Sequence, residues 1–385
     1  MSERNRGMPV VGMVGGGQLA RMTHQAAIGL GVGLRVMAAA ADDSAALVCA
    51  DARLGDYRSL DDLQVFARGI DVLTFDHEHV PNRHLRTLEA AGVAVRPGPA
   101  ALRHAQDKIA MRSRLTEIGA PSPRWCKVAD LADVSALAER TGWPVVLKAA
   151  RGGYDGKGVW LCGTPEEARA VIERAAAENV PLLAEERVEF RREVAALVAR
   201  SPHGQGAAYP LVETAQRDGI CHEVIAPAPG LDLDRAAEAQ RLALDIAAEL
   251  GVVGLLAVEL FETAEGMVVN ELAMRPHNSG HWTIEGANTS QFEQHLRAVL
   301  DLPLGSPQVT APVVVMANLL GGADPDVYGR YVHVMAKDPT VKVHLYGKSV
   351  RPGRKIGHVT ALGEDLDDVL GRARDAAAYL KGPAR

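Results

Sequence analysis

The chain has 385 residues, of which 47% are hydrophobic and 23% charged, a composition typical of a globular protein with two or three domains. Its net charge of −6 gives no broad attraction to nucleic acid or an anionic membrane, and no apolar run is long enough to span one. The four cysteines form no CxxC pair, and the polar N-terminus lacks a signal-peptide pattern, so we expect a cytoplasmic protein.

The first part of the chain alternates strands and helices. Apolar runs predict strands at 10–14, 34–38, 71–75 and 93–96, with helices after the glycine turn at 15–17 and at 82–91. This alternation predicts a small doubly wound α/β domain over residues 1–105.

The glycine turn of this domain has two possible ligands. Gly15, Gly17 and Ala20 match the G-x-G-x-x-A pattern of dinucleotide-binding turns, with Asp42 and Asp43 following the next strand. The same turn can also hold the phosphate of a small substrate at the helix N-terminus, where Gln18 would add an amide.

A second glycine-rich segment, "RGGYDGKG" at 151–158, follows a connecting region with a single predicted helix between prolines. It is not a P-loop, because Gly153 and Gly156 are separated by only two residues. It lies between the predicted strands 143–150 and 159–162, so we expect a hairpin tip whose N–H groups can bind phosphate. Lys148, inside the first of these apolar strands, needs either an anionic partner or an exposed face.

The following region predicts long strands at 193–200, 206–213 and 221–227, a helix at 234–250 and a hairpin over 255–271. Gly266 suits the turn of that hairpin. If Thr263 pairs with Met267, Glu259 lies directly opposite Glu271. Two carboxylates there repel each other, so they must share a proton or bind a divalent cation such as Mg²⁺. Helices at 290–300 and 366–380 and several short strands complete the chain.

Five motifs together resemble one family. "GGGQLARM", "TFDHEHV", "GGYDGKG", "NELAMRPHNSGHWT" and "RPGRKIGH", spread over residues 10–360, are similar to motifs of the N5-carboxyaminoimidazole ribonucleotide synthetases in the ATP-grasp superfamily. The resemblance implies a mixed α/β and α+β chain with an ATP-grasp fold, an N-terminal Rossmann-like (pre-ATP-grasp) domain and a small C-terminal β-rich subdomain. The implied divisions are a substrate-binding domain at 1–105, the connecting helix and lid at 106–185, the central domain with the metal hairpin at 186–305, and the C-terminal subdomain at 306–385.

The resemblance also implies site residues. The expected catalytic residues are Tyr154, Asp155, Arg275, His277 and Asn278, of which the last three would receive bicarbonate and Asp155 the substrate amine. The expected substrate-binding residues, for the ribonucleotide phosphate, are Gln18, Leu19, Lys348, Arg354 and Lys355. The expected metal ligands are Glu259 and Glu271. The expected ATP-binding residues are Lys108, Lys148, Gly153, Tyr154, Asp155, Gly156, Lys157, Gly158, Val159, Glu185, Glu186, Arg187, Val188, Glu193, Asn270 and Glu271.

The implied reaction is an ATP- and bicarbonate-dependent carboxylation of the amine of 5-aminoimidazole ribonucleotide, through carboxyphosphate, in purine biosynthesis. The amine would be carboxylated by carboxyphosphate itself or by CO₂ released from it. Mg²⁺, with Mn²⁺ as a substitute, would assist. We expect no biotin, because no carrier segment appears, and a homodimer by family resemblance. The alternatives are a formate-dependent glycinamide ribonucleotide formyltransferase, an NAD-dependent dehydrogenase and a non-catalytic nucleotide sensor. Asp76 and Gln216 depart from the family pattern, which has glutamate and histidine there.

Overall fold

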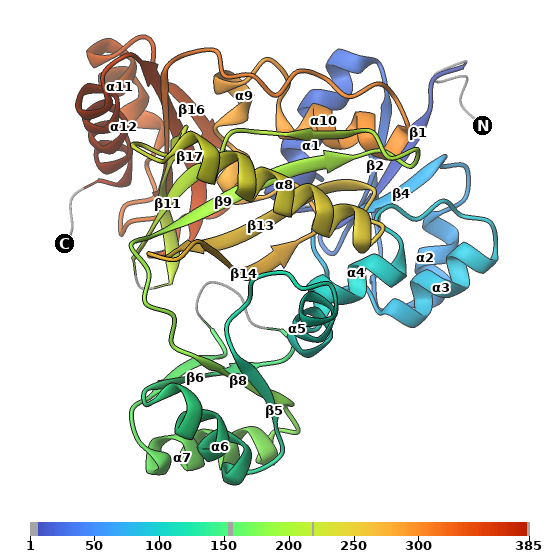
Figure 1. The fold of residues 1–385 in the computed structure, drawn as a ribbon. Helices are drawn as coiled ribbons and strands as arrows, with labels where there is room; N and C mark the ends of the chain where they lie inside the picture. Colours follow the sequence, from blue (N-terminus) through green and yellow to red (C-terminus); the bar gives the residue numbers. More distant parts are fainter. Residues whose placement is uncertain (1–6, 153–156, 218, 383–385) are drawn as a thin grey trace.

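The computed structural model describes residues 7–152, 157–217 and 219–382. Its elements form an N-terminal α/β domain, a small sheet with two helices that stands apart from the rest, and a large antiparallel sheet that carries the C-terminal helices (Figure 1). Within these residues, no helix has the length and apolar character needed to cross a membrane.

The N-terminal domain is a parallel sheet with strand order β3-β2-β1-β4. Its elements are β1 (Val10–Val14), α1 (Gln18–Leu30), β2 (Gly33–Ala38), β3 (Asp51–Leu54), α2 (Leu60–Phe66), β4 (Val72–Phe75) and α3 (Asn82–Ala90). The predicted alternation is confirmed, with two differences. The short edge strand β3 and helix α2 were not predicted, and the strand expected at 93–96 is only an isolated bridge between Leu73 and Val95.

The connecting segment contains two helices, α4 (Pro99–Gln106) and α5 (Lys108–Glu117), where one was predicted. Asp107 separates them because its backbone is extended, with φ −140° and ψ 108°. Its side chain accepts hydrogen bonds from the N–H groups of Ile109 and Ala110, at 3.0 and 3.1 Å, and so caps α5. The cap places Lys108 at the first position of α5.

The small sheet is antiparallel, in the order β5-β8-β6-β7. Its elements are β5 (Trp125–Val128), α6 (Leu131–Thr141), β6 (Val145–Ala149), β7 (Val159–Cys162), α7 (Pro165–Ala177) and β8 (Leu182–Glu186). Strands β6 and β7 form the predicted hairpin around the second glycine segment. Their inward residues pack with α6 and α7 in a separate core.

The large sheet has the strand order β14-β13-β9-β11-β12-β15-β17-β16, with β10 beside β9. Its strands are β9 (Arg192–Arg200), β10 (Gly206–Ala208), β11 (Val212–Arg217), β12 (Ile220–Ala226), β13 (Gly254–Glu262), β14 (Met267–Ala273), β15 (Val313–Leu320), β16 (Lys342–Leu345) and β17 (Lys355–Gly363). The strand predicted at 206–213 is divided into β10 and β11, with Pro210 between them, because proline cannot donate to a strand ladder. Strands β15, β17 and β16, which belong to the predicted C-terminal subdomain, follow β12 in this order and so continue the central sheet.

The helices of this part are α8 (Leu233–Glu249), α9 (Thr283–Gly286), α10 (Gln291–Leu300), α11 (Tyr331–Lys337) and α12 (Leu366–Lys381), with 3₁₀ turns η1 (Asn278–Gly280) and η2 (Tyr328–Arg330). Helix α8 packs on β9, α12 packs on β15 and β17, and α10 lies between the large sheet and α1 of the N-terminal domain (Figure 1). Helix α10 thus joins the large sheet to the N-terminal domain.

In the carboxylate hairpin, formed by β13 and β14, the predicted pairing of the two glutamates is present, but the strands are aligned differently near the turn. Glu259 lies opposite Glu271, as expected, but Met267 pairs with Glu262, where Thr263 was predicted. A bulge restores the alignment, because Leu260 pairs with Val269 and leaves Asn270 as an extra residue on β14. The assumed turn register was therefore wrong by one residue, and the bulge compensated for that error.

Candidate active site

One cavity of about 1480 Å³ collects residues from all four predicted segments of the chain. Every described site residue of the sequence analysis except Gly158 lines it: Gln18, Leu19, Lys108, Lys148, Lys157, Val159, Glu185, Glu186, Arg187, Val188, Glu193, Glu259, Asn270, Glu271, Arg275, His277, Asn278, Lys348, Arg354 and Lys355. The carbonyl of Gly158 accepts a hydrogen bond from the N–H of Ala149 at 2.8 Å. Gly153, Tyr154, Asp155 and Gly156 lie outside the described residues.

Lys148 is held by an anionic partner, which excludes the exposed-face alternative. Its Nζ lies 2.7 Å from Oε2 of Glu185 and 3.1 Å from Oδ1 of Asn270, and only 12% of its side chain is exposed. The Glu185 side chain is 3% exposed and also binds Nε of Arg112 at 2.6 Å. Although burial opposes it, the two cations lower the pKa of Glu185 to about 2, so it remains an anion.

Arg112 was not predicted as part of the site. Besides Glu185, it donates to the carbonyls of Val269 and Asn270, both at 2.8 Å, and so ties α5 to β14. Since both oxygens of Glu185 are engaged by cations, any contact of this residue with a nucleotide base would have to use its backbone. In the sequence Arg112 is one of several charged residues on α5, and nothing distinguishes it from those that face water.

The bulge on β14 brings two neighbouring side chains to the same cavity. In a regular strand Asn270 and Glu271 would point to opposite faces, whereas here both line the cavity. Glu271 contacts Nζ of Lys108, the first residue of α5. An amide, a carboxylate and two lysines therefore surround one end of the carboxylate hairpin.

The surroundings of Glu259 oppose its ionisation. Burial first, and then the negative charges of Glu271 and Glu193, raise the pKa of Glu259 to about 7. Its Oε1 lies 3.3 Å from Nε2 of His277. The repulsion predicted for this pair is thus present, and a proton or a cation would relieve it.

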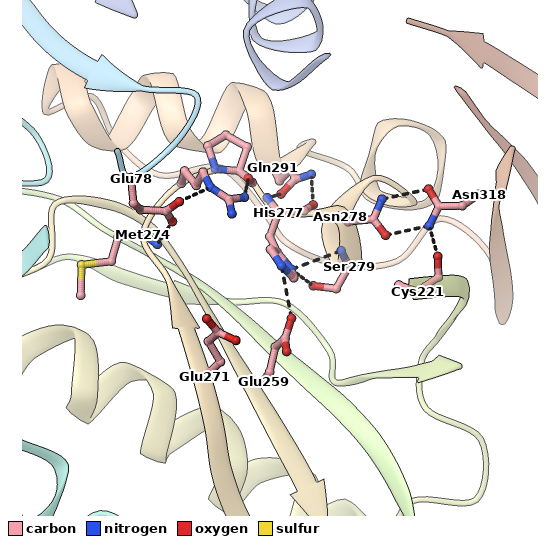
Figure 2. Close-up of polar contacts among 12 residues, drawn as sticks. Glu78, Cys221, Glu259, Glu271, Met274, His277, Asn278, Ser279, Gln291 and Asn318 are labelled. Atoms are coloured by element: carbon pink, nitrogen blue, oxygen red, sulfur yellow. Dashed lines mark hydrogen bonds and ion pairs between the residues drawn. The ribbon is translucent and has the colours of Figure 1, made fainter. Parts of the chain in front are cut away.

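The polar loop after β14 is held by residues that sequence reasoning did not find (Figure 2). Nε of Arg275 lies 2.7 Å from Oε2 of Glu78, and Oε1 of Glu78 accepts from the N–H of Met274 at 3.2 Å. Gln291, fully buried at the start of α10, accepts from the N–H of His277 and donates to its carbonyl, both at 2.8 Å. These partners are 14 to 197 positions away in the chain. Glu78 stands in the motif "TFDHEHV", but the motif does not indicate that it pairs with Arg275.

His277 is an uncharged group in this loop. Burial, assisted by the positive charges of Arg275 and Lys355, lowers the pKa of His277 to about 3. Its Nδ1 lies 2.9 Å from the hydroxyl of Ser279. A neutral imidazole beside a guanidinium can bind a planar oxyanion without protonating it.

The opposite end of the cavity is formed by α1 and the segment before β17. Lys348 contacts the side-chain oxygen of Gln18, and Arg354 donates to the Ser349 hydroxyl at 2.6 Å. Gly17 donates its N–H to Asp76, and a Cβ on Gly17 would come within 2.6 Å of the same carboxylate. Because Asp76 occupies the turn, the dinucleotide interpretation is not supported, whereas the N-terminus of α1 at Gln18 and Leu19 still suits a phosphate.

Gln216, one of the two departures from the family pattern, also lines the cavity. Burial raises the pKa of Glu193, and a hydrogen bond from Gln216 opposes that rise. The amide thus keeps a polar contact at the position where the family has histidine. Asp76 likewise reaches the cavity, and burial raises its pKa against the effect of the Gly17 N–H.

Comparisons with known proteins identify the family to which the chain belongs. Family models match as a ribonucleotide synthetase preATP-grasp domain at residues 8–106, an ATP-grasp domain at 113–292 and a phosphoribosylaminoimidazole carboxylase C-terminal domain at 314–372. N5-carboxyaminoimidazole ribonucleotide synthase of Mycobacterium bovis is 57% identical over 97% of this chain and 88% of its own length.

Two solved structures show the same fold. The Thermus thermophilus N5-carboxyaminoimidazole ribonucleotide synthetase is 37% identical, with a TM-score of 0.86 over 97% of this chain and 99% of that one. The Aspergillus clavatus enzyme in complex with ADP and 5-aminoimidazole ribonucleotide is 30% identical, with a TM-score of 0.87 over 97% and 98%. The predicted ATP-grasp fold is confirmed, while the exact domain boundaries stay predictions. The chain belongs to the N5-carboxyaminoimidazole ribonucleotide synthase family of ATP-grasp ligases.

Proposed function

We propose that the protein catalyses the ATP- and bicarbonate-dependent carboxylation of 5-aminoimidazole ribonucleotide on its amine. The observation that carries this proposal is the single cavity described above. It joins a lysine-lined end at β6 and α5 to a second basic end at α1 and residues 348–355, with the carboxylate hairpin and the loop at 275–278 also on its wall. Two phosphorylated ligands and a small oxyanion fit this distribution of charge.

The phosphates of ATP are assigned to the end that contains Lys108 and Lys148. The donor set there fits Mg²⁺, because Glu259, Glu271 and the amide of Asn270 offer oxygen ligands and leave positions for water and phosphate. Among the described residues no group of three or more acidic, histidine or cysteine side chains could hold a metal alone. When bound, the ion would neutralise charge on the transferred phosphoryl group.

Bicarbonate is assigned to Arg275, His277 and Asn278. An oxygen of bicarbonate forms a bond to the γ-phosphorus, the bond from that phosphorus to ADP breaks, and carboxyphosphate results. The amine nitrogen of the ribonucleotide then bonds to the carboxyl carbon, inorganic phosphate leaves with its electron pair, and one amine proton is released. Arg275, held by Glu78, stays positively charged throughout and stabilises the anion.

The ribonucleotide phosphate is assigned to the basic end formed by Gln18, Leu19, Lys348, Arg354 and Lys355. This placement puts the N-terminus of α1 and three cations around one dianion. Tyr154 and Asp155, which lie outside the described residues, retain their predicted place beside the substrate amine. We also propose that the protein is cytoplasmic, from its cysteine pattern and polar N-terminus, and that it is a homodimer. The homodimer is supported by family resemblance alone and is tested by light scattering on the purified protein.

The decisive experiment measures ADP and product with ATP and 5-aminoimidazole ribonucleotide, adding either bicarbonate or formate. We expect bicarbonate-dependent ADP release and an acid-labile carboxylated product. Formate-dependent formylation of glycinamide ribonucleotide would support the alternative ligase instead. ATP binding without any turnover would indicate a nucleotide sensor, and reduction of NAD by a purine intermediate would indicate a dehydrogenase.

A further inference from the structure

The side chain of Asn278 is paired with a buried amide from the C-terminal part of the chain (Figure 2). Its Nδ2 donates to Oδ1 of Asn318 at 2.9 Å, and its Oδ1 accepts from Nδ2 of Asn318 at 2.7 Å. Asn318 lies on β15, is 6% exposed and is not among the residues that line the cavity. It therefore touches the site only through its neighbours.

A third contact fixes the direction of this amide pair. An amide is nearly symmetric in shape, so a pair of amides alone could be reversed without loss of hydrogen bonds. Nδ2 of Asn318 also donates to the backbone carbonyl of Cys221 on β12, at 2.9 Å. Because a carbonyl can only accept, the NH₂ of Asn318 must face Cys221 and Oδ1 of Asn278.

The orientation of Asn278 follows from that of Asn318. Its oxygen faces Asn318, one N–H of its amide donates to Asn318, and the second N–H has no protein partner among residues 7–152, 157–217 and 219–382. Asn278 lines the cavity beside the neutral His277 and the cationic Arg275. A reversed amide would present its oxygen to an anion there, which replaces an attraction by a repulsion.

We propose that Asn318 is a positioning residue for the carboxylation site: it makes Asn278 a hydrogen-bond donor to the bicarbonate-derived oxyanion. This inference depends on the proposed function, because it takes the ligand at residues 275–278 to be a carboxyl anion. It also gives β15 a part in the reaction that is separate from the basic residues at 348–355.

A double-mutant cycle tests the inference, with initial rates measured against bicarbonate at saturating ATP and ribonucleotide. Asn318→Ala should raise the KM for bicarbonate on the order of 10-fold, the effect of about one charge-assisted hydrogen bond. The KM values for ATP and for the ribonucleotide should change less than about 2-fold on the same scale. In an Asn278→Ala background, Asn318→Ala should raise the bicarbonate KM no further, since the residue through which it acts is gone.

Gln294→Ala is the matched control. Gln294 is a fully buried amide on α10 that donates to and accepts from Gly305, at 2.8 and 2.7 Å, and it does not line the cavity. Gln294→Ala and Asn318→Ala each remove a buried amide, so both should lower the melting temperature. Gln294→Ala should leave the bicarbonate KM unchanged. If Asn318→Ala does not fold, Asn318→Ser, which also lacks the amide, replaces it in the cycle with the same expected results.

Three results would overturn the inference in an active enzyme: an unchanged bicarbonate KM, an equal rise in both backgrounds, or an equal rise in Gln294→Ala. A wild-type protein that forms no bicarbonate-dependent product would overturn the proposed function itself, and this inference with it.

Discussion

Glu259 and Glu271 carry an electrostatic repulsion that the unliganded protein does not fully relieve. Replacing Glu271 by Gln removes one charge and keeps the shape of the side chain. We expect the Glu271→Gln protein to melt at nearly the same temperature at neutral pH without metal, because relief of the repulsion with Glu259 is offset by loss of the ion pair with Lys108. It should lose on the order of 10²-fold in Mg²⁺-dependent turnover.

The measurements for this pair are thermal unfolding without metal and turnover against Mg²⁺ concentration. Glu265→Gln, an exposed change in the turn of the same hairpin, should leave both quantities unaltered. Near-normal activity of Glu271→Gln in saturating Mg²⁺ would contradict its assignment as a metal ligand.

Lys148 contributes the positive charge nearest to the buried Glu185 on the cavity side. Lys148→Ala should lower kcat/KM for ATP on the order of 10²-fold, because a preorganised cation at the phosphates is lost. Glu185 should stay ionised, since its ion pair with Arg112 remains. Lys127→Ala, an exposed lysine on β5 of the same sheet, is the control and should have no effect. Unaltered ATP kinetics in Lys148→Ala would show that this lysine does not touch the nucleotide.

At the scale of single residues, the sequence could indicate those site residues that are charged and stand among apolar neighbours. Lys148 and the two hairpin glutamates stand out because a buried charge needs a partner. Glu78, Arg112, Gln291 and Asn318 could not be found in this way. Each is an ordinary polar residue in its own segment, and its partner lies on another element.

At the scale of elements, the junction between α4 and α5 sets the position of Lys108. Asp107 caps α5, and its carboxylate also binds Arg151 at 2.8 and 2.9 Å. The N–H of Lys108 donates to the carbonyl of Ala150 at 2.8 Å, so this junction links α5 to the end of β6.

Asp107→Ala should cost about 1 kcal/mol of stability from the lost cap and raise the KM for ATP several-fold, because Lys108 is no longer fixed. Asp107→Asn can still cap and should recover most of the stability. Asp365→Ala is the matched control, because Asp365 caps α12 in the same manner and does not line the cavity. Thermal unfolding and ATP kinetics measure the two effects. A KM for ATP that rises equally in Asp365→Ala would show that the cap acts on stability alone.

The hairpin β13–β14 shows why element boundaries resist sequence reasoning. Its existence and the Glu259–Glu271 pair were predicted, but the turn register was wrong and a bulge at Asn270 compensated. A bulge depends on how the strand fits β9 and the cavity, which alternation of apolar residues does not reveal. The division of the connecting helix at Asp107 was missed for a similar reason, since Asp is also tolerated inside helices.

At the scale of the molecule, the resemblance of five sequence motifs to one family was enough to predict the ATP-grasp fold. The packing of the parts was not. The C-terminal strands continue the central sheet, and α10 joins that sheet to the N-terminal domain. Such contacts join residues that are hundreds of positions apart, and only the folded chain brings them together.

His295 on α10 is one of the polar links in this packing. It is fully buried, its ring Nε2 lies 2.8 Å from the hydroxyl of Thr74 on β4, and its Nδ1 accepts from the N–H of Leu255 on β13 at 3.2 Å. Burial lowers the pKa of His295 to about 3. The folded protein therefore keeps this imidazole neutral, whereas the unfolded chain protonates it below about pH 6.5.

The stabilisation from His295 should be complete above pH 6.5 and fall as the pH drops from 6.5 toward 3, because only the unfolded state then gains a proton. At pH 5.0 the loss from this residue is about 2 kcal/mol. His295→Gln should thus be less stable than wild type at pH 7.5 by roughly 1–3 kcal/mol, and this difference should shrink by about 2 kcal/mol at pH 5.0. Urea unfolding of both proteins at the two pH values measures it. His203→Gln is the control, because the His203 side chain is 84% exposed and its ion pair with Asp301 contributes little to stability. A stability difference for His295→Gln that does not change with pH would show that His295 is not held neutral between the two sheets.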